Sequence, residues 1–259
     1  MGKPIVKVAG IEINDLRRAE VLELLGRAVM DKDVPGELVV TPNLDHLTQI
    51  LNDRLFCGAY KKATLTIVDG FPVKLLSFLK LKAPLKEVIP GSEFTIELFE
   101  RVNRELPEGA VCNVFILGAN DKTIGLVRDR FEQDFPKLKL VGAFTGKIIV
   151  DDNISKLSCY LSDEITGCEV DLVIGSLGAP KQEVVCSLLH AKNPKITFLC
   201  VGATLEFFVG VKKRAPLILR RMKLEWLYRW SQEPYRLTRR YLLCFLTFLK
   251  LAFYKWERV

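Results

Sequence analysis

Polar residues crowd the end of an apolar run in the segment VVTPNLDHL. Two valines and a threonine predict the end of a buried strand, and the proline stops it. The hydroxyl of Thr41 and the amide of Asn43 could bind a polar substrate at this point. Asn43 or Asp45 could equally cap the helix that follows. We expect His46 to belong to that helix and to take no part in catalysis.

Asp69 is the best candidate for a catalytic base. It follows the apolar run Leu65–Val68, so we expect it at the carboxyl end of a strand, beside the polar segment just described. Burial there would raise the pKa of its carboxyl group and make it a usable base. The structural alternative is an Asx turn with Gly70, or the N-cap of a helix beginning near Pro72. The local sequence by itself favours this alternative.

The segment GAPKQE, residues 178–183, follows the apolar run VDLVIGSL. Its glycine and proline predict a helix start, where free backbone N–H groups can bind an anion. Lys181 and Gln182 could then contact a diphosphate or a sugar. A purely structural loop is the alternative.

Several common motifs are missing from the chain. It has no GxGxxG after the first strand, no P-loop and no GxSxG, which counts against dinucleotide oxidoreductases, NTPases and serine hydrolases. Asp31-Lys32-Asp33 has the DxD pattern of metal-dependent sugar transferases, but it stands beside a Val-Pro-Gly turn and is interpreted as solvated. With only two histidines, a His-rich metal centre is not expected.

The elements that would position these residues alternate between strand and helix. Helices are predicted over 15–30, 45–62 and 91–106, and apolar strands over ELVVT, LTIVDG, VCNVFILG, KLKLVGAF, VDLVIGSLG and ITFLCVGA. Apolar strands separated by helix lengths predict an α/β fold, with a mostly parallel, Rossmann-like sheet covered by helices on both faces. Ligands bind at the carboxyl ends of such strands. Glycines at these ends, including Gly178 and Gly202, would let a phosphate approach the backbone, although glycine is also common in ordinary α/β turns.

The net charge of +7 is unevenly spread over the 259 residues. Residues 211–259 contain 13 Lys and Arg against three Glu, and the rest of the chain 25 against 28 acids. The tail also holds all three tryptophans. We therefore divide the chain into a core, 1–210, and a basic helical appendage, 211–259.

The appendage has the composition of a membrane-interface helix, with cations on one face and aromatic and leucine side chains on the other. Its apolar run YLLCFLTFL is only nine residues long before Lys250, short of the roughly 20 that a spanning helix needs. The alternative is a helix packed on the sheet with solvated arginines. The seven cysteines lack CxxC spacing and the first residues do not resemble a signal peptide, so buried thiols in a reducing cytoplasm are expected.

Six segments occur together in order: TPNLDHL, DGFP, PGSE, LGAPKQE, VGATLEFFVG and RAP…LEWLYR…QEPYRLTRRYL. With these, the chain resembles the bacterial WecG/TagA/CpsF glycosyltransferases (glycosyltransferase family 26) from about Ile11 to Tyr241. The resemblance implies an inverting, metal-independent enzyme without a cofactor. It would move a sugar from a UDP-sugar to a polyprenyl-diphosphate-linked saccharide during cell-surface polysaccharide synthesis.

The resemblance also implies a place in the cell and a set of partners. The enzyme would be peripheral on the cytoplasmic face of the bacterial membrane, held to anionic lipid by its appendage. An exposed apolar tail could also form homo-oligomers, and no nucleic-acid partner is expected.

The family's functional positions map onto this sequence. Asp69 matches the proposed general base, Thr41 and Asn43 the same pocket, and Gln182 the donor side. Glu206 stands where the family usually has Asp, as a candidate for the nucleoside. The appendage arginines, candidates for binding diphosphate, are Arg229, Arg236, Arg239 and Arg240.

Two positions depart from the family pattern. Glu87, with Lys86 beside it, stands where the family often has Arg, and Glu93 replaces an Asp. Lys86 or the appendage would then supply the missing charge, or the acceptor is handled differently.

Two other classes of function remain possible from the residues alone. One is a nucleotide-dependent oxidoreductase on a doubly wound sheet. The other is a non-catalytic protein that binds a membrane surface or nucleic acid through its basic tail.

Overall fold

The computed structural model describes residues 3–151, 153–213, 215–216, 218–219, 222, 225–253 and 255–258. Its centre is a sheet of strand order β4-β3-β8-β7-β5-β6, in which every neighbouring pair is parallel. The strands are β3 (Leu38–Val40), β4 (Leu65–Thr66), β5 (Cys112–Gly118), β6 (Leu138–Phe144), β7 (Leu172–Ser176) and β8 (Thr197–Cys200). Each predicted apolar run supplies one strand, and the predicted α/β fold is confirmed.

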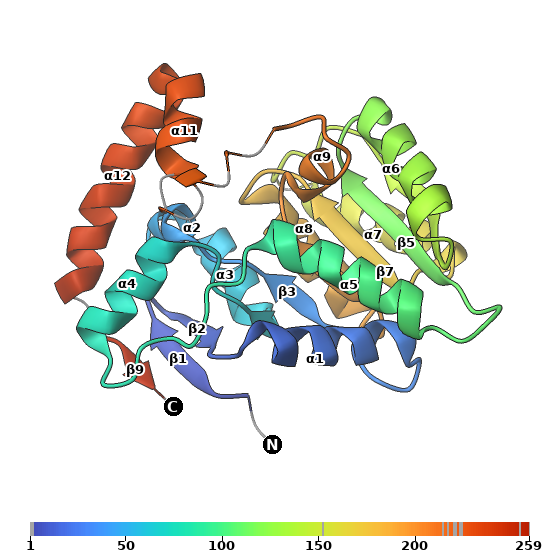
Figure 1. The fold of residues 1–259 in the computed structure, drawn as a ribbon, viewed down its shortest axis with the longest axis horizontal. Coiled ribbons are helices and arrows are strands. Elements are labelled where there is room, and N and C mark those ends of the chain that lie inside the picture. The colour runs from blue at the N-terminus through green and yellow to red at the C-terminus, as the bar shows by residue number, and fades with distance from the viewer. Residues whose placement is uncertain are drawn as a thin grey trace.

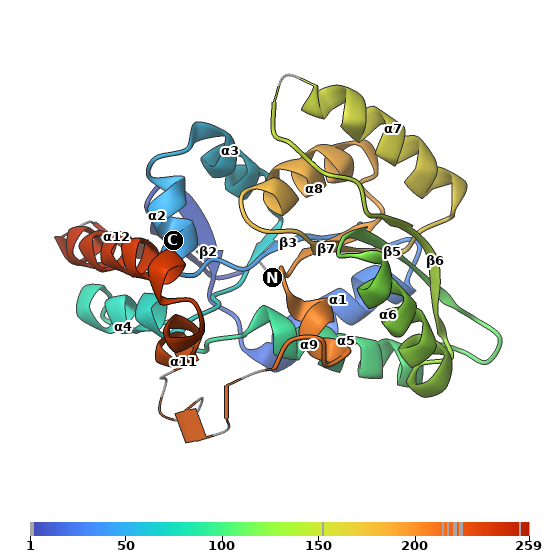
Figure 2. The same ribbon diagram turned by 90° about the horizontal axis from the view of Figure 1, so that it is seen from above.

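Helices cover both faces of this sheet (Figure 2). One face carries α1 (Arg18–Met30), α5 (Gly91–Glu105), α6 (Asp121–Asp134) and α9 (Thr204–Phe208). The other carries α3 (Arg54–Lys62), α7 (Ile154–Gly167) and α8 (Lys181–Lys192). The layered arrangement agrees with the predicted Rossmann-like sheet.

The inner strands are mostly apolar because their two faces pack into two different cores, whereas the edge strand β6 is partly exposed. In β3, Leu38 and Val40 pack into one buried cluster while Val39, between them, packs into the other. Successive side chains of a strand point to opposite faces of the sheet. In a strand that is covered on both faces, both sets of side chains are therefore buried and mostly apolar.

A small antiparallel sheet, which was not predicted, joins the two ends of the described chain (Figure 1). It contains β1 (Ile5–Val8), β2 (Ile11–Asn14) and β9 (Glu257–Arg258). Ala9 and Gly10 make the β1–β2 turn with φ of 52° and 80°, the positive values of a two-residue hairpin. The carboxylate of Asp15 accepts hydrogen bonds from Arg258 (2.5 Å) and from the backbone N–H of Lys86 (2.7 Å).

The single helix predicted over 45–62 is wrong, because the structure has two helices there. α2 (Leu44–Ile50) ends before Asp53, and α3 starts after it. The Asp53 carboxylate accepts hydrogen bonds from the backbone N–H groups of Leu55 and Phe56, at 2.9 and 3.0 Å. An aspartate that caps a new helix stabilises the break at this point.

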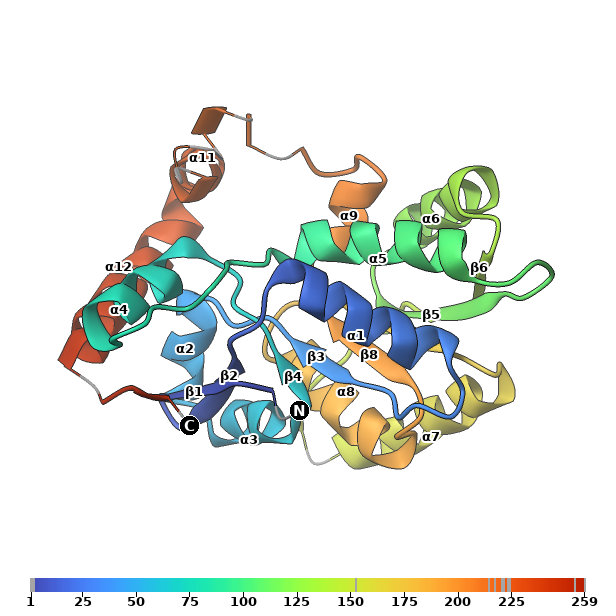
Figure 3. The same ribbon diagram turned by 60° about the horizontal axis from the view of Figure 1, so that its bottom comes forward.

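In the tail the structure describes two helices, α11 (Glu225–Gln232) and α12 (Pro234–Phe253), as predicted for a helical appendage, and the short strand β9 (Figures 1 and 3). α12 packs against α2 and against α4 (Phe71–Lys80). Its inward residues are Leu237, Cys244, Thr247 and Leu251. No helix among the described residues has both the length and the apolar content needed to cross a membrane.

The seven cysteines are all free thiols. Four are buried, as predicted for thiols in a core, namely Cys112, Cys186, Cys200 and Cys244. Cys159 is exposed on α7, so the prediction of buried thiols does not hold for every position.

Candidate active site

The carboxyl ends of β3 and β4 lie side by side. The two strands pair in parallel, and beyond the pairing the N–H of Ile67 donates to the carbonyl of Val40 at 3.0 Å. Two residues further on, the N–H of Asp69 donates to the carbonyl of Pro42, also at 3.0 Å. Asp69 therefore lies next to the polar segment that follows β3, which confirms the predicted neighbourhood.

The turn after Asp69 depends on glycine. Gly70 has a φ of +126°, which L side chains rarely adopt, and an added Cβ would lie 3.5 Å from the Cβ of Asn43. Gly70 also holds the N-cap position of α4. The interpretation of Asp69 as the N-cap of that helix is therefore wrong, and its half-buried carboxylate lies one residue before the cap.

Thr41 and Asn43 each tie the end of β3 to another element. The buried hydroxyl of Thr41 donates to the carbonyl of Cys200 at the end of β8, at 3.2 Å. The side-chain oxygen of Asn43 accepts from the N–H of His46 at 3.0 Å and so caps α2, as one of the predictions held. Binding of a substrate by the amide nitrogen of Asn43 stays a prediction.

A buried polar cluster lies behind these strand ends, and sequence reasoning missed it. His46 of α2 shares a 2.7 Å hydrogen bond between Nδ1 and the hydroxyl of Tyr60 of α3. The same nitrogen lies 3.9 Å from Oε1 of Glu183 of α8. His46 lies in the segment TPNLDHL and Glu183 in LGAPKQE, but nothing in the spacing of the two segments predicts that these side chains are in contact.

Burial changes the titration of all three groups. It raises the pKa of Glu183 to about 7, although the hydrogen bond from Gln182 opposes this shift. It lowers the pKa of His46 to about 4 and raises the pKa of Tyr60 well above 10. Glu183 is fully buried, and its Oε2 has no hydrogen-bond partner among the residues that the structure describes. Between about pH 4 and pH 7 the cluster is therefore largely uncharged.

Gln182 fixes the loop after β8 from inside. Its side-chain nitrogen donates to Oε1 of Glu183 at 2.9 Å, and its oxygen accepts from the N–H of Gly202 at 3.1 Å. The carbonyl of Gly202 accepts in turn from the hydroxyl of Ser176 at the end of β7, at 3.0 Å. Gln182 is thus buried and engaged within the protein, and its contact with a donor stays a prediction.

The other residues of the GAPKQE segment lie at the start of α8. Lys181 is the first residue of the helix and is half-buried, and its N–H donates to the carbonyl of Gly178 at 3.1 Å. A side chain at Gly178 would meet nothing within 4 Å, so the space beside this turn is open.

Two predicted residues lie toward the tail. The carboxylate of Glu206 in α9 pairs with Lys212 at 2.5 Å. Arg229 of α11 pairs with Glu225 at 2.6 Å and places its guanidinium 5.8 Å from the centre of the Phe207 ring. Arg229 thus connects the tail to α9, beyond the end of β8.

One of the three α12 arginines pairs with helix α2, close to the strand ends. Arg240 forms an ion pair of 2.7 Å with Asp45 of α2, two residues after Asn43. Arg236 pairs with Glu233, close to it in sequence. Arg239 is exposed and makes no ion pair within the described part of the chain.

The two positions that depart from the family pattern bind a single arginine of α1. Arg18 contacts Glu87 through its backbone N–H at 2.9 Å and Glu93 through its guanidinium at 3.0 Å. Lys86 points to Glu20 of the same helix, at 3.5 Å. Glu87 therefore holds α1 against the loop before α5, and Glu93 holds it against α5 itself.

The DxD segment forms a turn. The N–H of Asp33 donates to the carboxylate of Asp31 at 3.0 Å, and Lys32 forms an ion pair with Asp171. Across the described ranges, no three His, Cys, Asp or Glu side chains are grouped so that they could hold a metal ion.

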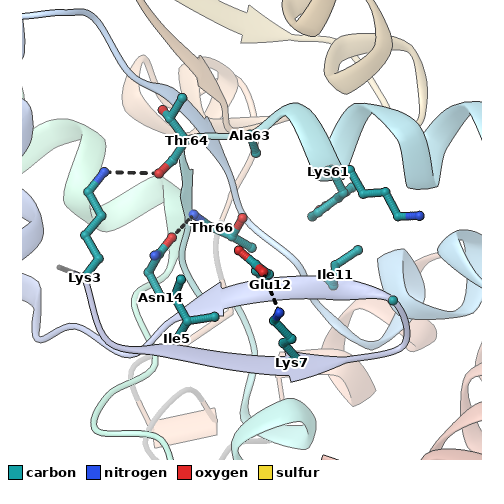
Figure 4. A pocket seen from close by; sticks show the side chains of 12 residues that line it. Lys3, Ile5, Lys7, Ile11, Glu12, Asn14, Lys61, Ala63, Thr64 and Thr66 are labelled. Carbon is teal, nitrogen blue, oxygen red and sulfur yellow. Dashed lines mark hydrogen bonds and ion pairs between the residues drawn. The ribbon is translucent and has the colours of Figure 1, made fainter. Parts of the chain in front are cut away.

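A pocket of about 670 Å³ opens elsewhere, between the β1–β2 hairpin, α3 and β4 (Figure 4). Several of its polar groups are paired with one another, such as Lys7 with Glu12 at 3.1 Å, and the N–H of Thr66 with the side chain of Asn14 at 2.7 Å. None of the predicted site residues lines it. We therefore place the candidate active site at the β3–β4 strand ends.

Comparison with known proteins identifies the family. The glycosyl transferase WecG/TagA/CpsF family matches residues 6–258. Similar proteins include the N-acetylglucosaminyldiphosphoundecaprenol N-acetyl-beta-D-mannosaminyltransferases of Staphylococcus aureus strains NCTC 8325 / PS 47, COL and MRSA252. Each is 24% identical over 226 residues, which cover 86% of this chain and 83% of the relative. The chain belongs to the WecG/TagA/CpsF family of glycosyltransferases.

Proposed function

We propose that the protein transfers a sugar from a UDP-sugar to a saccharide linked to a polyprenyl diphosphate. The observation that carries the proposal is the position of Asp69 beside Thr41 and Asn43, in a chain that matches a glycosyltransferase family from end to end of its fold. The family match does not favour an oxidoreductase or a non-catalytic binding protein.

Asp69 would act as the general base. It would take the proton of the acceptor hydroxyl while the hydroxyl oxygen forms a bond to the anomeric carbon of the donor sugar. The bond from that carbon to the β-phosphate oxygen breaks at the same time, and UDP leaves with the electron pair. Attack on the side opposite the leaving group inverts the anomeric configuration.

The leaving diphosphate would be stabilised by the protein's own positive groups. The N-terminal end of α8, with the Lys181 side chain in its first turn, can receive an anion. The tail arginines can add charge from the other side. We propose that transfer therefore needs neither a metal ion nor a cofactor.

The acceptor's lipid would bring the enzyme to the membrane. We propose peripheral binding to the cytoplasmic face through the appendage, whose cations suit anionic lipid and whose helices carry exposed aromatic and leucine side chains. Association of two copies through the same apolar side chains would compete with this when no membrane is present.

The test is a screen for UDP release. The donors are the UDP derivatives of N-acetylmannosamine, N-acetylmannosaminuronic acid, glucose and glucuronic acid, offered with a polyprenyl-diphosphate-linked N-acetylglucosamine. The relatives' names lead us to expect the highest rate with UDP-N-acetylmannosamine. The control is the same sugar without the lipid diphosphate, and acceptor-dependent UDP release with none of the donors would refute the proposal.

A further inference from the structure

Helix α4 has apolar side chains on its outer side as well as its inner side. Val73, Leu76 and Ser77 are buried. The α4 stripe on the opposite side consists of Phe71, Leu75, Phe78 and Leu79, which are 38, 38, 55 and 64% exposed. Their spacing of four, three and one residues places them on one side of the helix. A soluble helix normally shows polar residues there.

Helix α12 repeats the pattern and lies beside α4 (Figures 1 and 3). Side chains of the two helices, such as Leu76 and Leu251, belong to one buried cluster. The α12 stripe, on the side away from this contact, consists of the exposed residues Leu242, Phe245, Leu246, Leu249 and Phe253. Two adjacent helices therefore both leave large apolar side chains in water.

The charge of the two helices indicates what covers these stripes. Neither helix contains Asp or Glu, whereas α4 has two lysines and α12 has three arginines and a lysine. In a symmetric dimer built on this surface, like charges would face each other. An anionic bilayer offers apolar depth together with opposite charge.

The stripe on α4 starts at the candidate active site. Phe71, its first member, follows Gly70, and Gly70 follows Asp69. We propose that the α4 stripe is a second membrane-contacting surface, which rests on the anionic bilayer and holds Asp69 at the level where the acceptor's diphosphate and sugar leave the lipid. This inference rests on the proposed function for its biological meaning, but bilayer contact can be measured without it.

The experiment compares Phe78→Gln/Leu79→Gln with wild type and with Leu55→Gln. Leu55 on α3 is a matched control, because it is 64% exposed, like Leu79, and lies on a helix outside both stripes. Cosedimentation with phosphatidylglycerol vesicles should fall by about tenfold or more in the double variant, since two apolar side chains lose their place in lipid. The Leu55 variant should bind like wild type.

Turnover gives a second and separate readout. The double variant should lose activity on a full-length polyprenyl acceptor in vesicles and keep wild-type activity on a short-chain acceptor in solution. If the wild-type protein is inactive on both acceptors, the proposed function is refuted. The vesicle-binding measurement would then still test whether the α4 stripe contacts the bilayer.

Two results would overturn the inference. One is unchanged vesicle binding by a double variant that unfolds at the wild-type temperature. The other is a wild-type dimer in solution that the double variant breaks, without a change in vesicle binding, because the stripe would then belong to a second copy of the chain.

Discussion

The two sides of the candidate site are built by different means. The inner side, toward α8 and β8, is made of buried hydrogen bonds, such as those from Thr41 to Cys200 and from Gly202 to Gln182. The outer side, toward the tail, is made of ion pairs near the surface, of which Arg240 with Asp45 is the one that reaches α2.

This difference predicts different roles. Buried hydrogen bonds hold one geometry, because an unpaired polar group in the interior costs about 1–3 kcal/mol. Exposed ion pairs are worth only about 0–1 kcal/mol, so an arginine can leave its carboxylate for a phosphate at little cost. The inner side would therefore fix the position of the reacting groups, and the outer side would adapt to the charged parts of the substrates.

The largest effect should come from Asp69, the proposed base. Asp69→Asn keeps the shape of the side chain and removes its proton affinity, so sugar transfer should fall by about 100-fold or more. Acceptor-dependent UDP release measures it, with Asp163→Asn on the outer helix α7 as the matched control. Wild-type turnover by a folded Asp69→Asn protein would remove Asp69 from the mechanism.

The buried cluster should reveal itself in the pH dependence of stability. Burial raises the pKa of Glu183 from its ordinary 4.5 to about 7, so unfolding releases a proton and wild type loses stability as the pH rises through this window. The Glu183→Gln variant lacks this loss. The difference between its free energy of unfolding and that of wild type should therefore shift in its favour by about 3 kcal/mol between pH 4.5 and pH 7.

His46 should give the opposite slope. Its pKa falls from 6.5 to about 4 on burial, so wild type loses stability as the pH drops through that range. The free energy of unfolding of His46→Gln should therefore rise relative to that of wild type as the pH falls. Urea unfolding at several pH values measures both variants, and curves parallel to wild type would mean that neither group is buried as described.

The outer side should separate binding from stability. Arg240→Gln should change the free energy of unfolding by less than about 1 kcal/mol, because its ion pair is partly exposed. The KM for the donor or the acceptor should nevertheless rise. Arg130→Gln, which removes a 2.6 Å ion pair with Asp134 on α6, is the matched control. Equal kinetics in both variants would take Arg240 out of substrate binding.

The smallest effect should follow removal of metal ions. EDTA should leave the rate of UDP release unchanged, because the diphosphate is expected to be stabilised by N–H groups and cations of the protein. Strong inhibition that added Mg²⁺ or Mn²⁺ reverses would return Asp31 and Asp33 to consideration.

The sequence predicted the parts of the site that depend on local pattern and sheet topology. Asp69 and Asn43 could be placed together because both follow apolar runs, and the carboxyl ends of parallel strands share one edge. The cluster of His46, Tyr60 and Glu183 could not, because three helices bring it together only through tertiary packing. The break at Asp53 was missed because the apolar pattern continues across it.

The pairing of β1 with β9 has a consequence for the order of folding. Val6 pairs with Arg258, so β1 can pair with β9 only after about 250 further residues have been synthesised. The central sheet needs only residues up to β8 and can form on the ribosome, whereas the hairpin stays incomplete until the tail emerges. The helix on the outer side of the candidate site, α12, therefore takes its final position last, after the strand end that carries Asp69 has formed.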